Sequence, residues 1–122
     1  MEENARNNWL MQGDVSIAWQ TARDLQGKSR PDLRARIPFE GWGKAFLAAR
    51  NPDGFWGDRF YAPRWACTHY VLLELRAMGF PPSHPDIRAN VAQILSTHIA
   101  RDGGLGDAMG CIKSDVCING MF

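Results

Sequence analysis

The chain has 122 residues, of which 45% are hydrophobic and 22% are charged, and its formal net charge is +1. This composition predicts one soluble globular domain with enough apolar material for a core. The low net charge and the absence of a dense run of Lys and Arg exclude nucleic acid as the main ligand, because neutralising phosphates requires clustered cations.

The N-terminal segment and the cysteines indicate a cellular compartment. The first residues, MEENARNNWLMQGD, are acidic or amidic where a secretory signal would be basic and then apolar. No stretch of the sequence approaches the length of a transmembrane helix. The three cysteines, Cys67, Cys111 and Cys117, are odd in number and lack the spacing of a disulfide framework. These features predict a cytoplasmic protein with free thiols.

Apolar residues at helical spacing predict two helices near the N-terminus. Asp14 is placed as the N-cap of a helix over residues 15–25, which ends before Gly27. Pro31 is suited to open a second helix that runs through Ile37. Pro38 either kinks that helix or begins the next one, because proline lacks the N–H that a helix interior requires. We expect residues 1–38 to pack as capping helices.

Four more helices are expected in residues 39–122. The first covers 39–50, with Trp42 on its apolar stripe, and stops at the breaker sequence Asn51-Pro52-Asp53-Gly54. The second covers 63–78, opens at Pro63 and is terminated by Gly79. A third covers roughly 87–100 after Pro85, with Ile94 and Leu95 on its apolar stripe, and Ser114 marks the start of a last one.

The loops that follow 39–50 and 87–100 carry the same residues. Asp53, Gly54, Gly57 and Asp58 recur 49 residues later as Asp102, Gly103, Gly106 and Asp107. A period of this size indicates a helical repeat, in which each copy is a helix followed by a turn that needs glycine for positive φ. We therefore expect an all-α protein in which residues 39–122 form helical hairpin repeats and the last repeat is cut short.

The first copy also resembles a known family. Lys44-Ala45, Phe46-Leu47 and Gly54-Phe55-Trp56 are similar to the aromatic repeat motif of squalene and oxidosqualene cyclases. Arg50 stands where that motif has glutamine, and the spacing before Gly54 differs by one residue. Residues 61–79 resemble the partner helix of the same repeat in bacterial members of the terpene cyclase and protein prenyltransferase superfamily. The resemblance implies an α/α toroid, here an incomplete barrel.

The resemblance also suggests candidate ligands. In protein prenyltransferases an Asp-x-Cys pair supplies two zinc ligands, so Asp115 and Cys117 are candidate metal residues; their other interpretation is a helix-start carboxylate and a structural thiol. The Asp-x-Asp-Asp acid motif of protonation-initiated cyclases does not occur in the sequence. An apolar isoprenoid or lipid-like molecule would bind among Trp42, Trp65, His69 and Tyr70. No catalytic residue is assigned.

Two functional hypotheses remain open at this stage. The chain is either a terpene cyclase-like or prenyltransferase-like repeat protein that binds an isoprenoid, or a non-catalytic repeat scaffold for protein–protein interaction. An array with two repeats leaves an apolar end, so we also expect self-association, or a partner, to cover Met121, Phe122 and the exposed side of helix 63–78.

Overall fold

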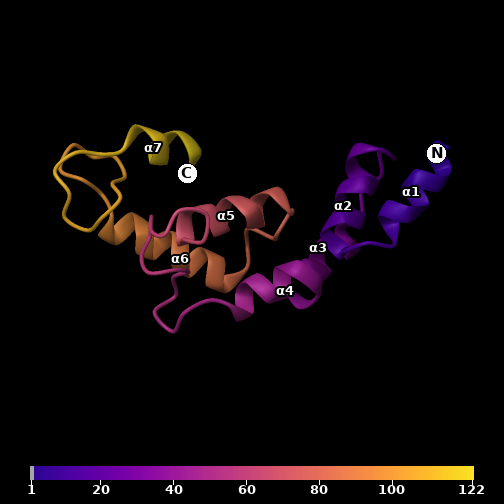
Figure 1. Ribbon diagram of the computed structural model, residues 1–122, viewed down its shortest axis with the longest axis horizontal. Helices are drawn as coiled ribbons and strands as arrows, with labels where there is room; N and C mark the ends of the chain where they lie inside the picture. Colours follow the sequence, from indigo (N-terminus) through magenta and orange to yellow (C-terminus); the bar gives the residue numbers. More distant parts are fainter. Residues whose placement is uncertain (1) are drawn as a thin grey trace. The chain divides into compact units, whose positions relative to one another are not determined.

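The computed structural model describes residues 2–122, and the described residues contain helices and no strand, which confirms the all-α prediction. Figure 1 shows the elements in chain order. They are α1 (Glu3–Met11), α2 (Val15–Asp24), α3 (Pro31–Arg36), the 3-10 helix η1 (Ile37–Phe39), α4 (Gly41–Ala48), α5 (Thr68–Ala77), α6 (Pro85–Thr97) and α7 (Val116–Met121).

The chain divides into two compact units, and α5 contributes to both. The first unit consists of Met1–Ala49 and Leu75–Pro81, and the second of Arg50–Glu74 and Pro82–Phe122. The boundary predicted at residue 38 falls inside the first unit. The toroid arrangement of the repeats stays a prediction.

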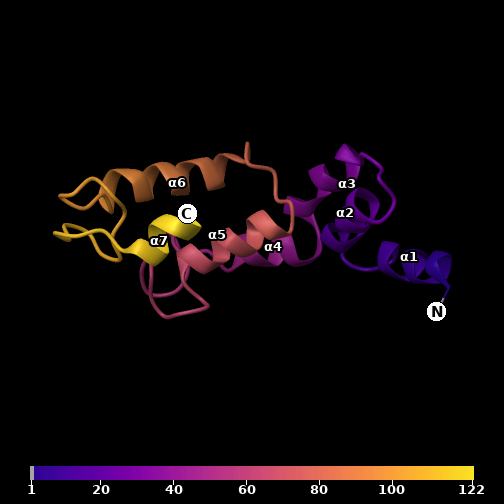
Figure 2. The ribbon, with the colours of Figure 1, turned by 90° about the horizontal axis from the view of Figure 1, so that it is seen from above.

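The first unit is built around α2, which packs against α1, α3 and α4 (Figure 2). Small side chains let these helices approach closely, since Ala18 and Ala22 of α2 are buried together with Leu33 and Ile37. The segment after α5 is held to this core by Arg34, whose Nε donates to the Gly79 carbonyl at 2.8 Å.

Most expected helices of the two units exist, but several boundaries differ. Helix 63–78 begins only at Thr68, because Trp65 has a φ of 71° and residues 58–62 are held in a hydrogen-bonded turn. The last helix is capped by Asp115, whose carboxylate accepts from the Ile118 N–H, and not by Ser114. Pro38 lies in η1, so it separates α3 from α4. Helix α1 has no counterpart among the predicted elements.

The second unit has a core that α6, α7 and the loops between helices share. Phe60, Ile94, Leu105 and Ile118 are buried together, and Leu72 packs against them. Ile94 is completely buried whereas Leu95 is 47% exposed, so the predicted apolar stripe of this helix is wrong at Leu95. The long loop between α6 and α7 extends beyond the end of α6 in both views (Figures 1 and 2).

The two copies of the predicted sequence repeat lie in the second unit and have matching backbone hydrogen bonds. In the first copy, Asn51 N–H donates to the Phe55 carbonyl at 2.8 Å, and Gly54 N–H donates to the Asn51 carbonyl at 2.9 Å. In the second copy, the bonds from Ala100 N–H to Gly104 and from Gly103 N–H to Ala100 measure 2.8 and 3.0 Å. Gly54 and Gly103 have φ of 91° and 90°. We call these the first turn and the second turn.

Each turn is followed by a buried residue whose backbone is clamped by a side chain of the next helix. Thr68 Oγ accepts from Trp56 N–H at 2.8 Å and lies 3.2 Å from the Trp56 carbonyl oxygen. Asn119 accepts from Leu105 N–H at 2.9 Å and donates to the Leu105 carbonyl at 2.8 Å. Because both polar groups of each buried peptide are satisfied, the chain enters the core without an unpaired backbone group.

Candidate functional site

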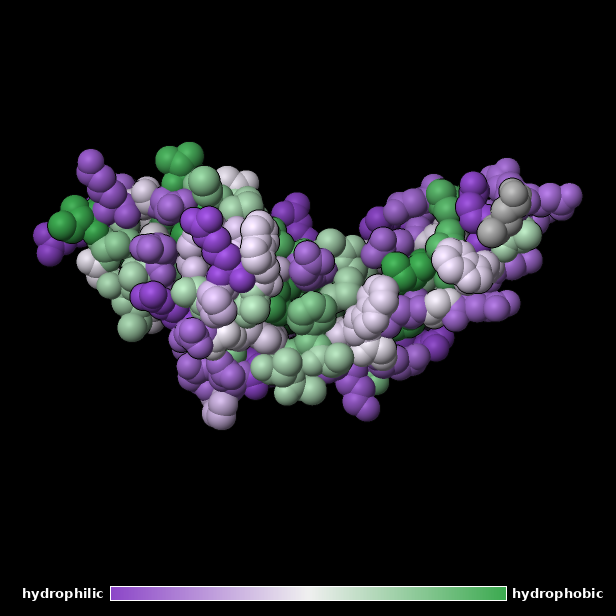
Figure 3. All heavy atoms as spheres, viewed as in Figure 1, coloured by the Kyte–Doolittle hydropathy of each residue, from purple (hydrophilic) through white to green (hydrophobic). Residues whose placement is uncertain are grey.

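The first unit contains an apolar pocket between the start of α4 and the helices α1 and α2. Its volume is about 510 Å³, and its lining includes Trp9 and Leu10 of α1, Ile17 of α2 and Trp42 of α4. Trp9 is 67% exposed and Trp42 is 53% exposed, although indoles are usually well buried. In Figure 3 hydrophobic residues appear among the hydrophilic ones over α1 and α2. Two indoles are therefore available to a bound molecule.

Asp14 fixes Trp42 at the edge of this pocket. One carboxylate oxygen accepts from the Ser16 N–H and caps α2, while the other accepts from the Trp42 N–H at 2.8 Å. Gly41 has a φ of 52°, and a Cβ there would collide with the same carboxylate. Burial by itself would raise the pKa of Asp14, but the hydrogen bonds from Ser16 and Trp42 lower the pKa below 3.8. The carboxylate therefore stays ionised and joins α2 to α4.

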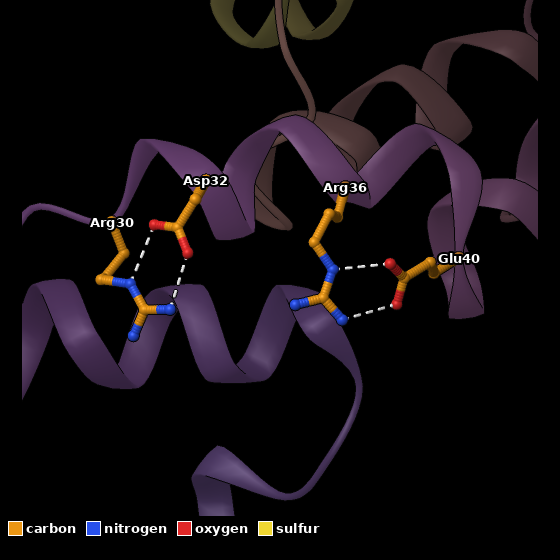
Figure 4. Close-up of polar contacts among 4 residues, drawn as sticks. All are labelled: Arg30, Asp32, Arg36 and Glu40. Carbon is orange, nitrogen blue, oxygen red and sulfur yellow. Dashed lines mark hydrogen bonds and ion pairs between the residues drawn. The ribbon is translucent and has the colours of Figure 1, made fainter.

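A second pocket of the first unit, about 380 Å³, is basic. It is lined by Trp19 together with Arg23, Lys28, Arg30 and Arg34. Arg23 pairs with Asp24, and Arg30 forms a bidentate pair with Asp32 at 2.7–2.8 Å, which Figure 4 shows beside the equivalent pair of Arg36 and Glu40. Because carboxylates already neutralise two of the four cations, this pocket is a weaker candidate for a ligand than the apolar one.

The second unit carries an aromatic cluster around His69. The Tyr61 and Tyr70 rings stack at 5.8 Å with their hydroxyl oxygens 3.3 Å apart, and Trp65 packs against Tyr70 at 5.0 Å. The hydrogen bond with Tyr70, followed by burial, raises the pKa of Tyr61 to about 12. Trp65 is 77% exposed and has the left-handed φ noted above, a conformation that is uncommon for a bulky residue.

His69 lies beneath these rings and is 1% exposed. Phe60, Tyr61 and Tyr70 meet the imidazole edge to face at 5.2–5.7 Å. Neither ring nitrogen has a hydrogen-bond partner within the part of the chain that the structure describes. Burial lowers the pKa of His69, and the charge of Asp115 opposes this shift only partly, so the imidazole is neutral at pH 7.

Asp115 and Cys117, the predicted metal residues, lie near the aromatic cluster. Asp115 is the N-cap of α7, and Cys117 belongs to that helix. The charge of Asp115 acts on both His69 and Tyr61. Its carboxylate is occupied as the N-cap of α7, and Cys117 is an exposed free thiol. Across residues 2–122 no group of three or more His, Cys, Asp and Glu side chains is placed to hold a metal ion. A zinc site at Asp115 and Cys117 therefore remains a prediction that depends on the resemblance.

The structure brings together three of the four predicted ligand residues. Trp65, His69 and Tyr70 form one cluster in the second unit, whereas Trp42 lines the pocket of the first. Sequence reasoning missed Trp9 and Ile17. The apolar run Trp9-Leu10-Met11 was the available signal, but it follows a polar segment without helical periodicity.

No family model, curated protein or solved structure matches this chain. Within the described residues, none of the helices has the length and apolar character that crossing a membrane requires.

Proposed function

We propose that this protein binds an apolar, isoprenoid-like or lipid-like ligand in the pocket of the first unit. The observation that carries the proposal is a pocket of about 510 Å³ whose lining includes the indoles of Trp9 and Trp42 and the aliphatic side chains of Leu10 and Ile17. Pockets for small molecules commonly measure about 300–1,000 Å³ and are lined mainly by apolar and aromatic groups.

The chemistry of the lining defines the class of ligand. An apolar chain laid across Trp9 and Trp42 would remove both exposed indoles from water, and apolar burial stabilises by roughly 25 cal/mol per Å². Asp14 is the only ionised side chain of the lining, and its carboxylate already accepts from Ser16 and Trp42. An uncharged ligand therefore suits the pocket better than an anion. The resemblance to squalene cyclase repeats supports an isoprenoid within this class.

Binding of farnesol, measured by the change in tryptophan fluorescence, tests the proposal. The substitution Trp42→Ala should weaken binding about tenfold or more, since it removes a large apolar contact. Trp65→Ala, in the second unit, is the matched control and should leave the affinity unchanged. Binding that is lost in Trp65→Ala and kept in Trp42→Ala would place the ligand on the aromatic cluster of the second unit and overturn the proposal.

A scaffold for protein partners is the second candidate function. The observation that favours it is the exposed second turn, whose equivalent in the first copy is covered by a helix. This candidate needs neither a metal nor a catalytic group.

A further inference from the structure

Helix α6 covers the first turn through three polar contacts. Asn90 Nδ2 donates to the Gly54 carbonyl at 2.7 Å, and Gln93 Nε2 donates to the Asp53 carbonyl at 3.3 Å. One helical turn earlier, Asp86 pairs with Arg50 at 3.4 Å. Residues 86, 90 and 93 lie on one face of a helix, so a single helix face recognises the turn.

The second turn has the same backbone geometry, but no helix of the described residues reaches its Asp102 and Gly103 side, since α7 approaches only Gly104, through Asn119. The backbone hydrogen-bond distances of the two turns agree within a tenth of an ångström, and the φ angles of Gly54 and Gly103 agree within one degree. A Cβ on Gly54 would meet Gln93 at 3.2 Å, whereas nothing lies within 4 Å of a Cβ on Gly103. No group among residues 2–122 donates a hydrogen bond to the carbonyl of Asp102 or of Gly103. These two carbonyls are the equivalents of the ones that α6 binds.

Exposed apolar residues flank the second turn. Ile99, which is 43% exposed, stands 49 residues after Arg50. The Arg101 N–H donates to the Cys111 carbonyl, so the exposed Met109 and Ile112 lie on the loop segment that is tied to this turn. A helix that docks here would meet an apolar side chain where α6 meets a cation.

We propose that the second turn is a docking site for an α-helix of a partner protein that carries an apolar residue, then Asn four positions later and Gln three positions after that. The Asn would donate to the Gly103 carbonyl and the Gln to the Asp102 carbonyl, while the apolar residue packs on Ile99. The proposal goes beyond ligand binding in the first unit and does not depend on it.

A second copy of this chain does not provide such a helix. The spacing Asn-x-x-Gln occurs once in the sequence, at Asn90 and Gln93, and both side chains are engaged with the first turn of their own chain. The residue four positions before Asn90 is Asp86, which is matched to Arg50 and not to Ile99. The partner is therefore a different helix with a related face.

A synthetic peptide based on α6 is the probe for this site. The peptide has the sequence of Pro85–Thr97 with Asp86→Leu, and a lactam bridge on the opposite face holds it helical, because so short a peptide is marginally helical in water. Fluorescence anisotropy should show saturable binding to the wild-type protein. A peptide that also carries Asn90→Ala and Gln93→Ala should bind about tenfold more weakly, since two hydrogen bonds are lost.

Changing residue 99 of the protein together with position 86 of the peptide distinguishes binding at the second turn from binding at the first. The Ile99→Arg protein, whose fold is checked by circular dichroism, should reverse the preference between the two peptides. The peptide that keeps Asp86 should then bind about fivefold better than the Asp86→Leu peptide. If the wild-type protein prefers the Asp86 peptide, the peptide has replaced α6 at the first turn, and the proposal is contradicted. Absence of binding, or equal affinity for the Asn90→Ala, Gln93→Ala peptide, would also overturn it. So would self-association that Ile99→Arg abolishes, because the occupant would then be a second copy.

Discussion

His69 shows how much of a candidate site depends on the environment of one side chain. The sequence predicts that this histidine binds a ligand together with Trp65 and Tyr70, and the three residues do lie together. The imidazole itself is buried with both nitrogens unpartnered among the described residues, which is costly for a polar group. The neutral ring costs less to bury than the imidazolium, so the cluster favours the unprotonated form.

We expect this burial to make the protein sensitive to acid. Because burial lowers the pKa of His69 in the folded state, the unfolded chain binds a proton more readily, and stability should fall as the pH falls below about 6.5. Urea unfolding at pH 8, 7, 6 and 5 measures this dependence. His69→Phe should reduce the loss between pH 7 and 5, and part should remain because burial also lowers the pKa of His98. An unchanged pH dependence in the variant would contradict the account.

At the scale of elements, Pro31 and Pro85 predict the starts of α3 and α6 correctly, and the first glycine of each copy predicts a turn, whereas Pro63 does not predict the start of α5. Asp53-Gly54 and Asp102-Gly103 occur in closely matching turns because positive φ restricts the residue type strongly. Pro63 is compatible with a helix start, but α5 begins five residues later at Thr68. Its start depends on the hydroxyl of Thr68 reaching Trp56, a contact between distant residues that local sequence does not encode.

The clamp on the first turn makes a quantitative prediction. Thr68→Val keeps the shape of the side chain but removes the hydroxyl that accepts from the Trp56 N–H, so the free energy of unfolding should fall by about 1–3 kcal/mol. Thr68→Ser retains the hydroxyl and serves as the control, with a smaller loss. Urea denaturation compares the three proteins. Equal stability of Thr68→Val and the wild type would show that the hydroxyl does not hold the turn.

At the scale of the whole molecule, the predicted set of ligand residues divides between two compact units. Trp42 belongs to the first unit, and Trp65, His69 and Tyr70 belong to the second. Periodicity identifies the individual helices, but it carries no information about which helices form one core. The pocket beside Trp42 depends on α1, a helix whose sequence has no clear apolar stripe, and this is why the sequence does not predict Trp9 there.

We expect the apolar surface of α7 to drive self-association. Val116 is 85% exposed and Phe122 is 40% exposed, although the Phe122 ring also packs edge-on against Phe60 at 6.2 Å. Burying such exposed apolar side chains between two copies of the chain is favourable, because it removes apolar area from water. A weak association has a roughly micromolar affinity, so sedimentation velocity is measured between about 1 and 100 µM protein. The average mass should rise with the protein concentration. Val116→Glu should lower it. A monomer throughout would count against this expectation.

The most direct test of the proposed function is an NMR titration with farnesol that follows the indole N–H signals of the five tryptophans. Ligand binding in the pocket of the first unit predicts saturable shifts of the Trp9 and Trp42 signals, while those of Trp19, Trp56 and Trp65 stay nearly fixed. Shifts confined to Trp65, or no shift of any indole signal, would contradict the account.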